Sequence, residues 1–235
     1  MPSIRLDRFL SNQAGLTRSE SREMLKSLRV RVNGRTEKNY DYKINTDKDR
    51  VELNGEEIRY SQYVYLLMNK PRGVITATED KRQKTVLDLV PQRYKGRDLS
   101  PVGRLDKDTT GALLITDDGV FAHKVISPKS GIEKEYIAVL DGDITDDMVA
   151  EFANGVTLVD GTRCLPAVLK RVGECTAAIT ISEGKYHQIK RMFGTVGLGV
   201  NELKRVRIGN LCLCDDLQPG ELIEVDMNTV LALNC

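Results

Sequence analysis

The most informative stretch of the chain is Val102-Gly-Arg-Leu-Asp-Lys-Asp-Thr-Thr-Gly-Ala-Leu-Leu-Ile-Thr-Asp-Asp-Gly119. Acidic residues and glycines come first, and the apolar run 112–116 follows them. A short apolar run bounded by turn residues is typical of a buried strand. The segment before this run is therefore expected to be a loop that presents carboxylates, with Asp106 and Asp108 as the candidates for chemistry.

A calcium-binding loop is one alternative for this segment. Asp106, Asp108 and Thr110 fall at positions 1, 3 and 5 of such a loop, with Gly111 at position 6 and Asp117 at position 12. The flanking segments are not helical in pattern, and position 12 holds aspartate where a bidentate glutamate is usual. These two departures count against calcium.

A phosphotransferase of the haloacid-dehalogenase type is a second alternative, because Asp106-x-Asp108-x-Thr110 resembles its nucleophile motif. That type of enzyme needs a buried apolar strand directly before its first aspartate. Pro101 and Gly103 stand there instead, and both residues argue against a strand interior.

The first 59 residues have the pattern of a small separate domain. Thr17-Arg-Ser-Glu20 predicts a capping box that opens a helix running to about residue 28. Asn33-Gly34 predicts a hairpin between two short strands. On the helix and just after it, four basic residues fall within a stripe roughly 80° wide, which suits contacts with phosphates. These four residues are Arg18, Arg22, Lys26 and Arg29.

The remaining residues, 60–235, mix many strands with few helices, which favours an α+β fold. The strand-like runs are 64–68, 112–116, 135–140, 167–170, 177–182 and 222–225. Helices are expected from Thr145, as an N-cap, to about Gly155, and over residues 187–196. Residues 56–62 are expected to form a linker between the two domains.

Composition indicates a folded protein, because 40% of the residues are hydrophobic and 29% are charged. No apolar stretch is long enough to span a bilayer. Five cysteines without a C-x-x-C pair suit a reduced, cytoplasmic location. The net charge of +1 means that any affinity for nucleic acid must come from local basic groups.

Several segments, taken together, resemble the RNA pseudouridine synthases, and in particular the RsuA type that modifies 16S ribosomal RNA. The first is Gly103-Arg-Leu-Asp106 followed by Asp108-Thr-Thr-Gly111. The others match the family in the same order along the chain: Lys70-Pro-Arg-Gly73, Glu133-Lys-Glu-Tyr136, Ile181-Ser-Glu-Gly-Lys-Tyr-His-Gln-Ile-Lys-Arg-Met192 and Leu203-Lys-Arg-Val-Arg-Ile-Gly209. The N-terminal domain is similar to an RNA-binding module first seen in a ribosomal protein, the S-four-like domain.

This resemblance implies a catalytic domain with a mixed, mainly antiparallel sheet, a uridine in structured RNA as substrate, and neither cofactor nor metal. Asp106 matches the catalytic aspartate, Tyr136 the tyrosine that stacks on uracil, and Lys190 the basic partner of the aspartate, with Arg191 as the fallback. The remaining matches are expected to hold RNA. Ile189 and Leu203 would wall the base, and Arg104 would fill the space left by the flipped nucleotide. Lys70 and Arg72 would project from a turn toward phosphates, and residues 204–207 would form a second basic loop of this kind.

The resemblance leaves the target open. Uridine 516 of 16S RNA, free or in a small-subunit assembly intermediate, is the expected substrate of a monomeric enzyme. A sister enzyme acting on 23S ribosomal RNA or transfer RNA is an alternative. A non-catalytic RNA-binding assembly factor is another, although the complete set of Asp106, Tyr136 and Lys190 argues against it.

Overall fold

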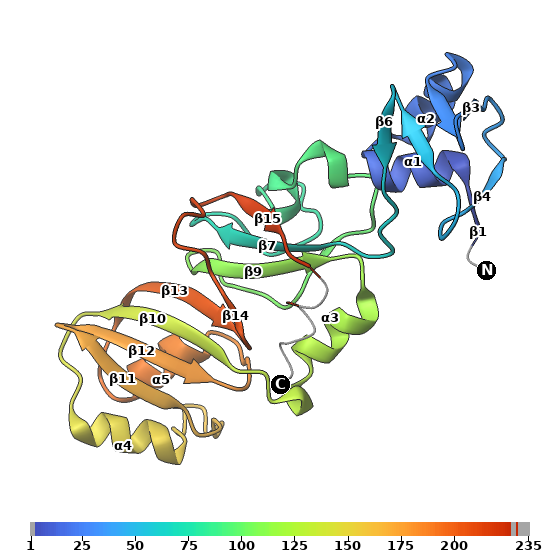
Figure 1. The fold of residues 1–235 in the computed structure, drawn as a ribbon. Helices are drawn as coiled ribbons and strands as arrows, with labels where there is room; N and C mark the ends of the chain where they lie inside the picture. Colours follow the sequence, from blue (N-terminus) through green and yellow to red (C-terminus); the bar gives the residue numbers. More distant parts are fainter. Residues whose placement is uncertain (1–2, 227–228, 230–235) are drawn as a thin grey trace. The chain divides into compact units, whose positions relative to one another are not determined.

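The computed structural model describes residues 3–226 and residue 229, and the chain divides into two compact units. The N-terminal unit comprises the residues up to Val64 together with Val90–Leu99, and the C-terminal unit holds the rest (Figure 1). Sequence reasoning placed a single boundary after residue 59 and did not foresee that a later segment joins the first unit. The last cysteine, Cys235, lies outside the described residues.

Two short sheets, two α-helices and the 3-10 helix η2 (Gln92–Tyr94) build the described part of the N-terminal unit. Strand β1 pairs with β4, and a second antiparallel sheet has the order β3-β2-β5-β6. The elements are β1 (Ser3–Arg5), α1 (Leu6–Ala14), α2 (Arg18–Lys26), β2 (Val30–Val32), β3 (Arg35–Thr36), β4 (Lys43–Asn45), β5 (Val51–Leu53) and β6 (Glu56–Ile58). The linker predicted over residues 56–62 is wrong at its start, because Glu56–Ile58 pairs with β5.

Local sequence signals account for these elements. Thr17 and Glu20 form the predicted capping box, in which each side chain accepts a hydrogen bond from the other residue's backbone N–H. Asn33 and Gly34 both have positive φ, as a two-residue hairpin turn requires. The apolar sides of both helices and of the strands meet in one core, formed by Leu6, Phe9, Leu10, Leu25, Val30, Val32, Ile44 and Val51.

The segment Val90–Leu99 joins this unit through a close backbone contact. Gly15 ends α1 with a φ of +65°, and a Cβ atom there would lie 2.4 Å from the Cα of Arg93. Arg97 also donates hydrogen bonds to the side chain of Gln13 and to the carbonyl of Ser61. Glycine is therefore needed at position 15 both for the helix end and for the approach of this segment.

One large sheet organises the C-terminal unit, with the strand order β11-β12-β10-β13-β9-β7-β15 (Figure 1). Every pairing is antiparallel except that of β9 with β13, so the predicted mixed, mainly antiparallel α+β fold is confirmed. The strands are β7 (Tyr65–Lys70), β8 (Ser100–Pro101), β9 (Thr110–Thr116), β10 (Lys134–Leu140), β11 (Val168–Gly173), β12 (Thr176–Ile181), β13 (Val200–Ile208), β14 (Leu211–Cys212) and β15 (Leu222–Glu224).

The parallel pairing of β9 with β13 is short. It consists of two residue pairs, Lys204 with Thr110 and Arg205 with Gly111, which we call the seam. A Cβ atom on Gly111 would lie 2.1 Å from the carbonyl oxygen of Arg205, and Gly111 has a φ of +98°. Only glycine allows the two strands to approach this closely. The seam joins the β11-β12-β10-β13 half of the sheet to the β9-β7-β15 half.

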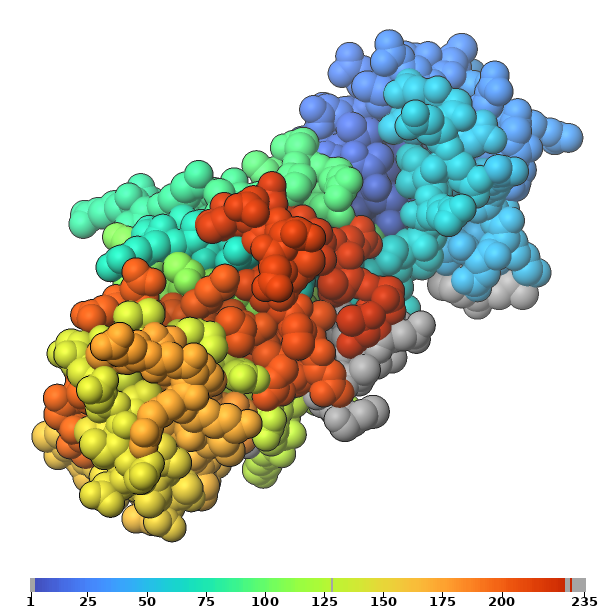
Figure 2. Space-filling view, turned by 60° about the vertical axis from the view of Figure 1, so that its left-hand side comes forward, coloured from blue at the N-terminus to red at the C-terminus, as the bar shows by residue number. Residues whose placement is uncertain are grey.

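In the described part of this unit the α-helices are α3 (Gly119–Ile126), α4 (Asp146–Asn154) and α5 (Gln188–Thr195), beside the short 3-10 helices η1 (Val86–Leu89) and η3 (Pro128–Ser130). The predicted N-cap Thr145 is confirmed, since its side chain accepts a hydrogen bond from the first turn of α4. Asp118 caps α3 in the same way. Helix α4 packs on β11 and α5 on β13. In the space-filling view of Figure 2, the C-terminal residues, coloured red, lie beside both the yellow and orange surface and the teal surface of this unit. Among the described residues, no helix has the length and apolar content that crossing a membrane would require.

Candidate active site

Asp106 lies on the loop between β8 and β9, at the edge of the seam. Leu105, the residue before Asp106, is held by Thr76. The Thr76 hydroxyl donates a hydrogen bond to the Leu105 carbonyl at 2.8 Å and accepts one from the Leu105 N–H at 3.2 Å. Both Thr76 and Leu105 are buried, whereas the Asp106 side chain remains 30% exposed. The fold thus holds the Asp106 carboxylate at a fixed position where a ligand can reach it.

Lys70 supports the same loop from beneath. Its ammonium donates hydrogen bonds to the carbonyls of Thr109 (2.9 Å), Pro71 (3.1 Å) and Lys107 (3.3 Å), and its exposed fraction is 0%. The expectation that Lys70 projects from a surface turn toward phosphates is therefore wrong. Its long side chain is buried because its ammonium supplies donors to carbonyls inside the fold, of which that of Lys107 also accepts from the Gly73 N–H.

Burial lowers the pKa of Lys70 from 10.5 to about 8, and the charges of Asp108 and Asp106 oppose this shift only in part. Between about pH 8 and 10.5 the unfolded chain keeps a proton that the folded protein has released. The contribution of Lys70 to the free energy of unfolding must therefore rise with pH across this window.

We expect Lys70→Met to lower the free energy of unfolding by about 1–3 kcal/mol near pH 7, because buried carbonyls lose their donor. The deficit relative to wild type should grow as the pH is raised from 8 toward 10.5, since the variant lacks the titrating group. Urea unfolding at several pH values measures both effects. If the free energies of unfolding of the two proteins changed with pH in parallel, the lowered pKa of Lys70 would be contradicted.

Lys190, on α5, supplies the cation nearest to the two acidic residues of the loop. Its ammonium lies 2.6 and 2.7 Å from the two carboxylate oxygens of Asp108 and 3.9 Å from Asp106 Oδ2. The hydrogen bond from Lys190 lowers the pKa of Asp108, against the opposing effect of partial burial. Arg191, the fallback partner, instead pairs with Asp160. The structure thus places Lys190, and not Arg191, beside Asp106.

His187 also reaches the loop of Asp106, with Nε2 at 3.5 Å from Asp106 Oδ1. It precedes α5 and has left-handed backbone angles, with φ 48° and ψ 34°. Buried Glu183 organises this entry to the helix by accepting hydrogen bonds from Gln188 and from the backbone of Leu165 and by pairing with Lys185. Sequence reasoning left the role of His187 open and missed Glu183 altogether.

Tyr136, on β10, is buried next to a charged residue that the sequence did not single out. Arg205 on β13 is 3% exposed, and its guanidinium lies 3.4 Å from the Tyr136 hydroxyl and 5.9 Å from the centre of its ring. Its Nε donates to the carbonyl of Ala112 at 2.7 Å, just past the seam. Residues 204–207, expected to be a basic loop, are strand, and Arg207 pairs with Glu133 and Glu135.

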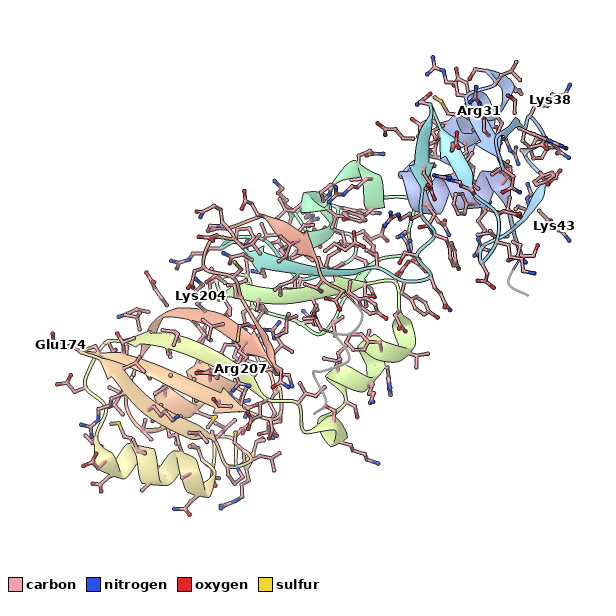
Figure 3. All side chains as sticks on the ribbon, in the orientation of Figure 1. Arg31, Lys38, Lys43, Glu174, Lys204 and Arg207 are labelled. Carbon is pink, nitrogen blue, oxygen red and sulfur yellow. The ribbon has the colours of Figure 1, made fainter. Side chains whose placement is uncertain are left out.

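The remaining predicted site residues fall into two groups. Ile189 and Leu203 are buried, on α5 and β13. Arg72 and Arg104 are exposed in the segments after β7 and before Asp106. In the N-terminal unit, Arg18, Arg22, Lys26 and Arg29 are all exposed, and Arg22 also pairs with Asp7 and lies over the ring of Tyr40. Arg31, Lys38 and Lys43 add further exposed charges to that unit (Figure 3).

The geometry contradicts both alternatives considered for the acidic loop. The whole of β9, seven residues, separates Asp106 from Asp117, which is about 20 Å of extended chain, so the two cannot share one calcium ion. The phosphotransferase alternative requires a strand that leads directly into Asp106. The preceding strand, β8, ends instead at Pro101.

A family model described as RNA pseudouridylate synthase matches residues 64–195, more than half of the chain, and an S4 domain model matches residues 4–51. These two matches define an RNA-modifying isomerase with an appended S4 domain. The chain belongs to the RNA pseudouridine synthase family, whose members isomerise uridine to pseudouridine.

Relatives match over nearly the full length. A ribosomal small subunit pseudouridine synthase A of Yersinia pestis is 42% identical, over 93% of each chain. An uncharacterised RNA pseudouridine synthase of Bacillus subtilis is 37% identical, over 98% of each chain. A crystal structure of a pseudouridylate synthase superposes with a TM-score of 0.69 at 33% identity, covering 98% of this chain and 99% of that one.

Proposed function

We propose that this enzyme converts one uridine of small-subunit ribosomal RNA, uridine 516 of 16S RNA, into pseudouridine. The observation that carries the proposal is the Asp106 carboxylate, held open to ligand on a loop fixed by Thr76 and Lys70 and placed beside Lys190. The choice of substrate follows the Yersinia pestis relative, whose name states its action on the small ribosomal subunit.

The reaction breaks the bond between ribose C1′ and uracil N1, turns the base and joins C1′ to C5. Nothing is added to the substrate, so a carboxylate near the sugar is the main requirement. Asp106 either attacks C1′ as a nucleophile or removes a ribose proton. Lys190, whose ammonium lies 3.9 Å from Asp106 Oδ2, attracts this carboxylate and helps to orient it toward the sugar.

The uridine must leave its base stack before Asp106 can reach the sugar, at a cost of a few kcal/mol. We infer that Tyr136 stacks on the flipped uracil, that Ile189 and Leu203 wall it, and that Arg104 occupies the space it leaves. Arg72 and the exposed cations of the S4 domain then offset the cost through phosphate contacts. The two units are proposed to act as a cytoplasmic monomer on 16S RNA or a small-subunit assembly intermediate.

Release of tritium from RNA labelled at uridine C5 tests this proposal, because isomerisation frees the C5 hydrogen. The substrates are 16S RNA, partly assembled small subunits, 23S RNA and transfer RNA, each made with [5-³H]uridine. We expect release from a small-subunit substrate alone, with carbodiimide mapping placing the new pseudouridine at position 516. Release from 23S RNA or transfer RNA alone would show that the target uridine lies in that RNA and not in 16S RNA. Tight binding to RNA without any release would favour a non-catalytic assembly factor.

A further inference from the structure

Tyr186 presents an aromatic ring to solvent next to the active site. Its exposed fraction is 76%, whereas Tyr65, Phe121, Tyr136, Phe152 and Phe193 of the C-terminal unit are all buried. Among the described residues of that unit, Tyr186 is therefore the one exposed tyrosine or phenylalanine. Exposure by itself is ordinary for a single residue, so the contacts of the ring decide its meaning.

The Tyr186 ring is connected to the catalytic carboxylate through one neighbour. It stacks on the imidazole of His187, with 3.9 Å between the ring centres and 17° between the planes. His187 Nε2 in turn lies 3.5 Å from Asp106 Oδ1. One face of the tyrosine is thus covered by a ring that touches the loop of Asp106, and the side chain as a whole remains largely open to solvent.

The backbone beneath this pair is held in place. The left-handed conformation of His187 is rare for a residue with a side chain and persists where surrounding contacts enforce it. Those contacts include Gln188, whose side chain accepts from the Lys185 N–H at 2.9 Å, and Arg191, which donates to the Tyr186 carbonyl at 3.4 Å. The ring pair is therefore mounted on an ordered turn and is preorganised for a planar ligand.

We propose that Tyr186 and His187 form a stacking platform for the nucleobase adjacent to the target uridine. This inference rests on the proposed function, in which the ribose of that uridine lies at Asp106. A base stacked on Tyr186 lies one ring beyond His187, so it belongs to a neighbouring nucleotide and not to the reacting one. Any of the four bases has a face that stacks on an aromatic ring, so the platform holds the strand with little dependence on sequence.

The test compares Tyr186→Ala and Tyr186→Phe with Val120→Ala, an exposed apolar residue on α3 at the opposite end of β9 from Asp106. Substrates are fragments of 16S RNA spanning uridine 516, with 2-aminopurine on its 5′ or 3′ side. We expect Tyr186→Ala to raise KM roughly 5- to 100-fold, the range that loss of one base–aromatic stack gives, with little change in kcat. Quenching of 2-aminopurine on binding should be lost in Tyr186→Ala and retained in the other variants.

Normal tritium release with unchanged KM and quenching in Tyr186→Ala would overturn the platform while leaving the proposed function intact. A defect in Tyr186→Phe equal to that in Tyr186→Ala would also overturn it, because the hydroxyl and not the ring would then be the important group. Absence of release by wild type from every ribosomal RNA, with Tyr186-dependent quenching retained, would overturn the proposed function and support the platform.

Discussion

Replacing Asp106 by asparagine is expected to lower the rate of tritium release by roughly 10³-fold or more, whichever chemical route operates. Asparagine has nearly the same shape but can neither attack C1′ nor take a ribose proton. The backbone contacts that hold the loop come from Thr76 and Lys70 and do not involve the Asp106 carboxylate. The fold and the affinity for RNA should therefore persist. Single-turnover assays, with RNA binding measured in parallel, check both parts of the prediction.

Asp108→Asn is the matched control, because it changes a carboxylate on the same loop. Asp108 holds Lys190 through two short contacts, so its replacement should free the ammonium to interact more with Asp106. We expect a loss of activity much smaller than that of Asp106→Asn. Equal losses in the two variants, or an active Asp106→Asn enzyme, would contradict the assignment of Asp106 as the catalytic group.

Replacing Gly111 by alanine is expected to destabilise the C-terminal unit by about 2–5 kcal/mol, the sum of a left-handed backbone penalty and an overpacking cost. The added methyl would lie 2.1 Å from the carbonyl oxygen of Arg205, and backbone at that position cannot move aside cheaply. Relief requires β9 and β13 to part at the seam, which displaces the loop carrying Asp106 from Lys190. Activity should therefore fall together with stability, as urea unfolding and tritium release would show.

Gly119→Ala is the control for this substitution. A Cβ atom at Gly119 meets no heavy atom within 4 Å, and its φ is not in the left-handed region. Because alanine is the better helix former, this change at the start of α3 should be neutral or stabilising by up to about 1 kcal/mol. A Gly111→Ala protein as stable and active as Gly119→Ala would show that the seam is not tightly packed in solution.

Much of the fold could be predicted because local signals carried it. Turn residues, caps and apolar runs indicated most strands and helices. The segment before the apolar run 112–116 was predicted to be a loop that presents carboxylates, and it is one. The proximity of Asp106 and Lys190 was expected from motifs 84 residues apart in the chain, and the 3.9 Å contact agrees with that expectation. The roles assigned to the other site residues stay predictions.

The rest could not be predicted because two basic side chains are buried. Lys70 and Arg205 stand in segments that read as basic surface, since lysine and arginine are seldom fully buried. Each is inside for a reason that depends on the tertiary fold. Lys70 satisfies carbonyls of a loop some 37 residues later, and Arg205 bonds to Ala112 on a strand that the sequence does not mark as its neighbour. Strand β13 was not predicted for a related reason. Its buried Arg205 breaks the alternation of apolar and polar residues that indicates a strand.

Whether a folded molecule is also an active one depends on the seam between β9 and β13. Asp106 precedes β9 in one half of the sheet, whereas Tyr136 on β10 and Lys190 on α5 belong with the other half. Among the described residues, the backbone pairing of β9 with β13 is two residue pairs long. The hydrogen bond from Arg205 to Ala112 and the ion pair of Lys190 with Asp108 are further links between the halves. Proteins open locally at free energies well below that of global unfolding, and a contact this short is a place for such opening. On such opening each half keeps its own hydrogen bonds while Asp106 moves away from the proposed partners Lys190 and Tyr136. Only those folded conformations in which the seam is closed are therefore expected to be active. On heating, the rate of turnover should fall at a lower temperature than the one at which the sheet unfolds.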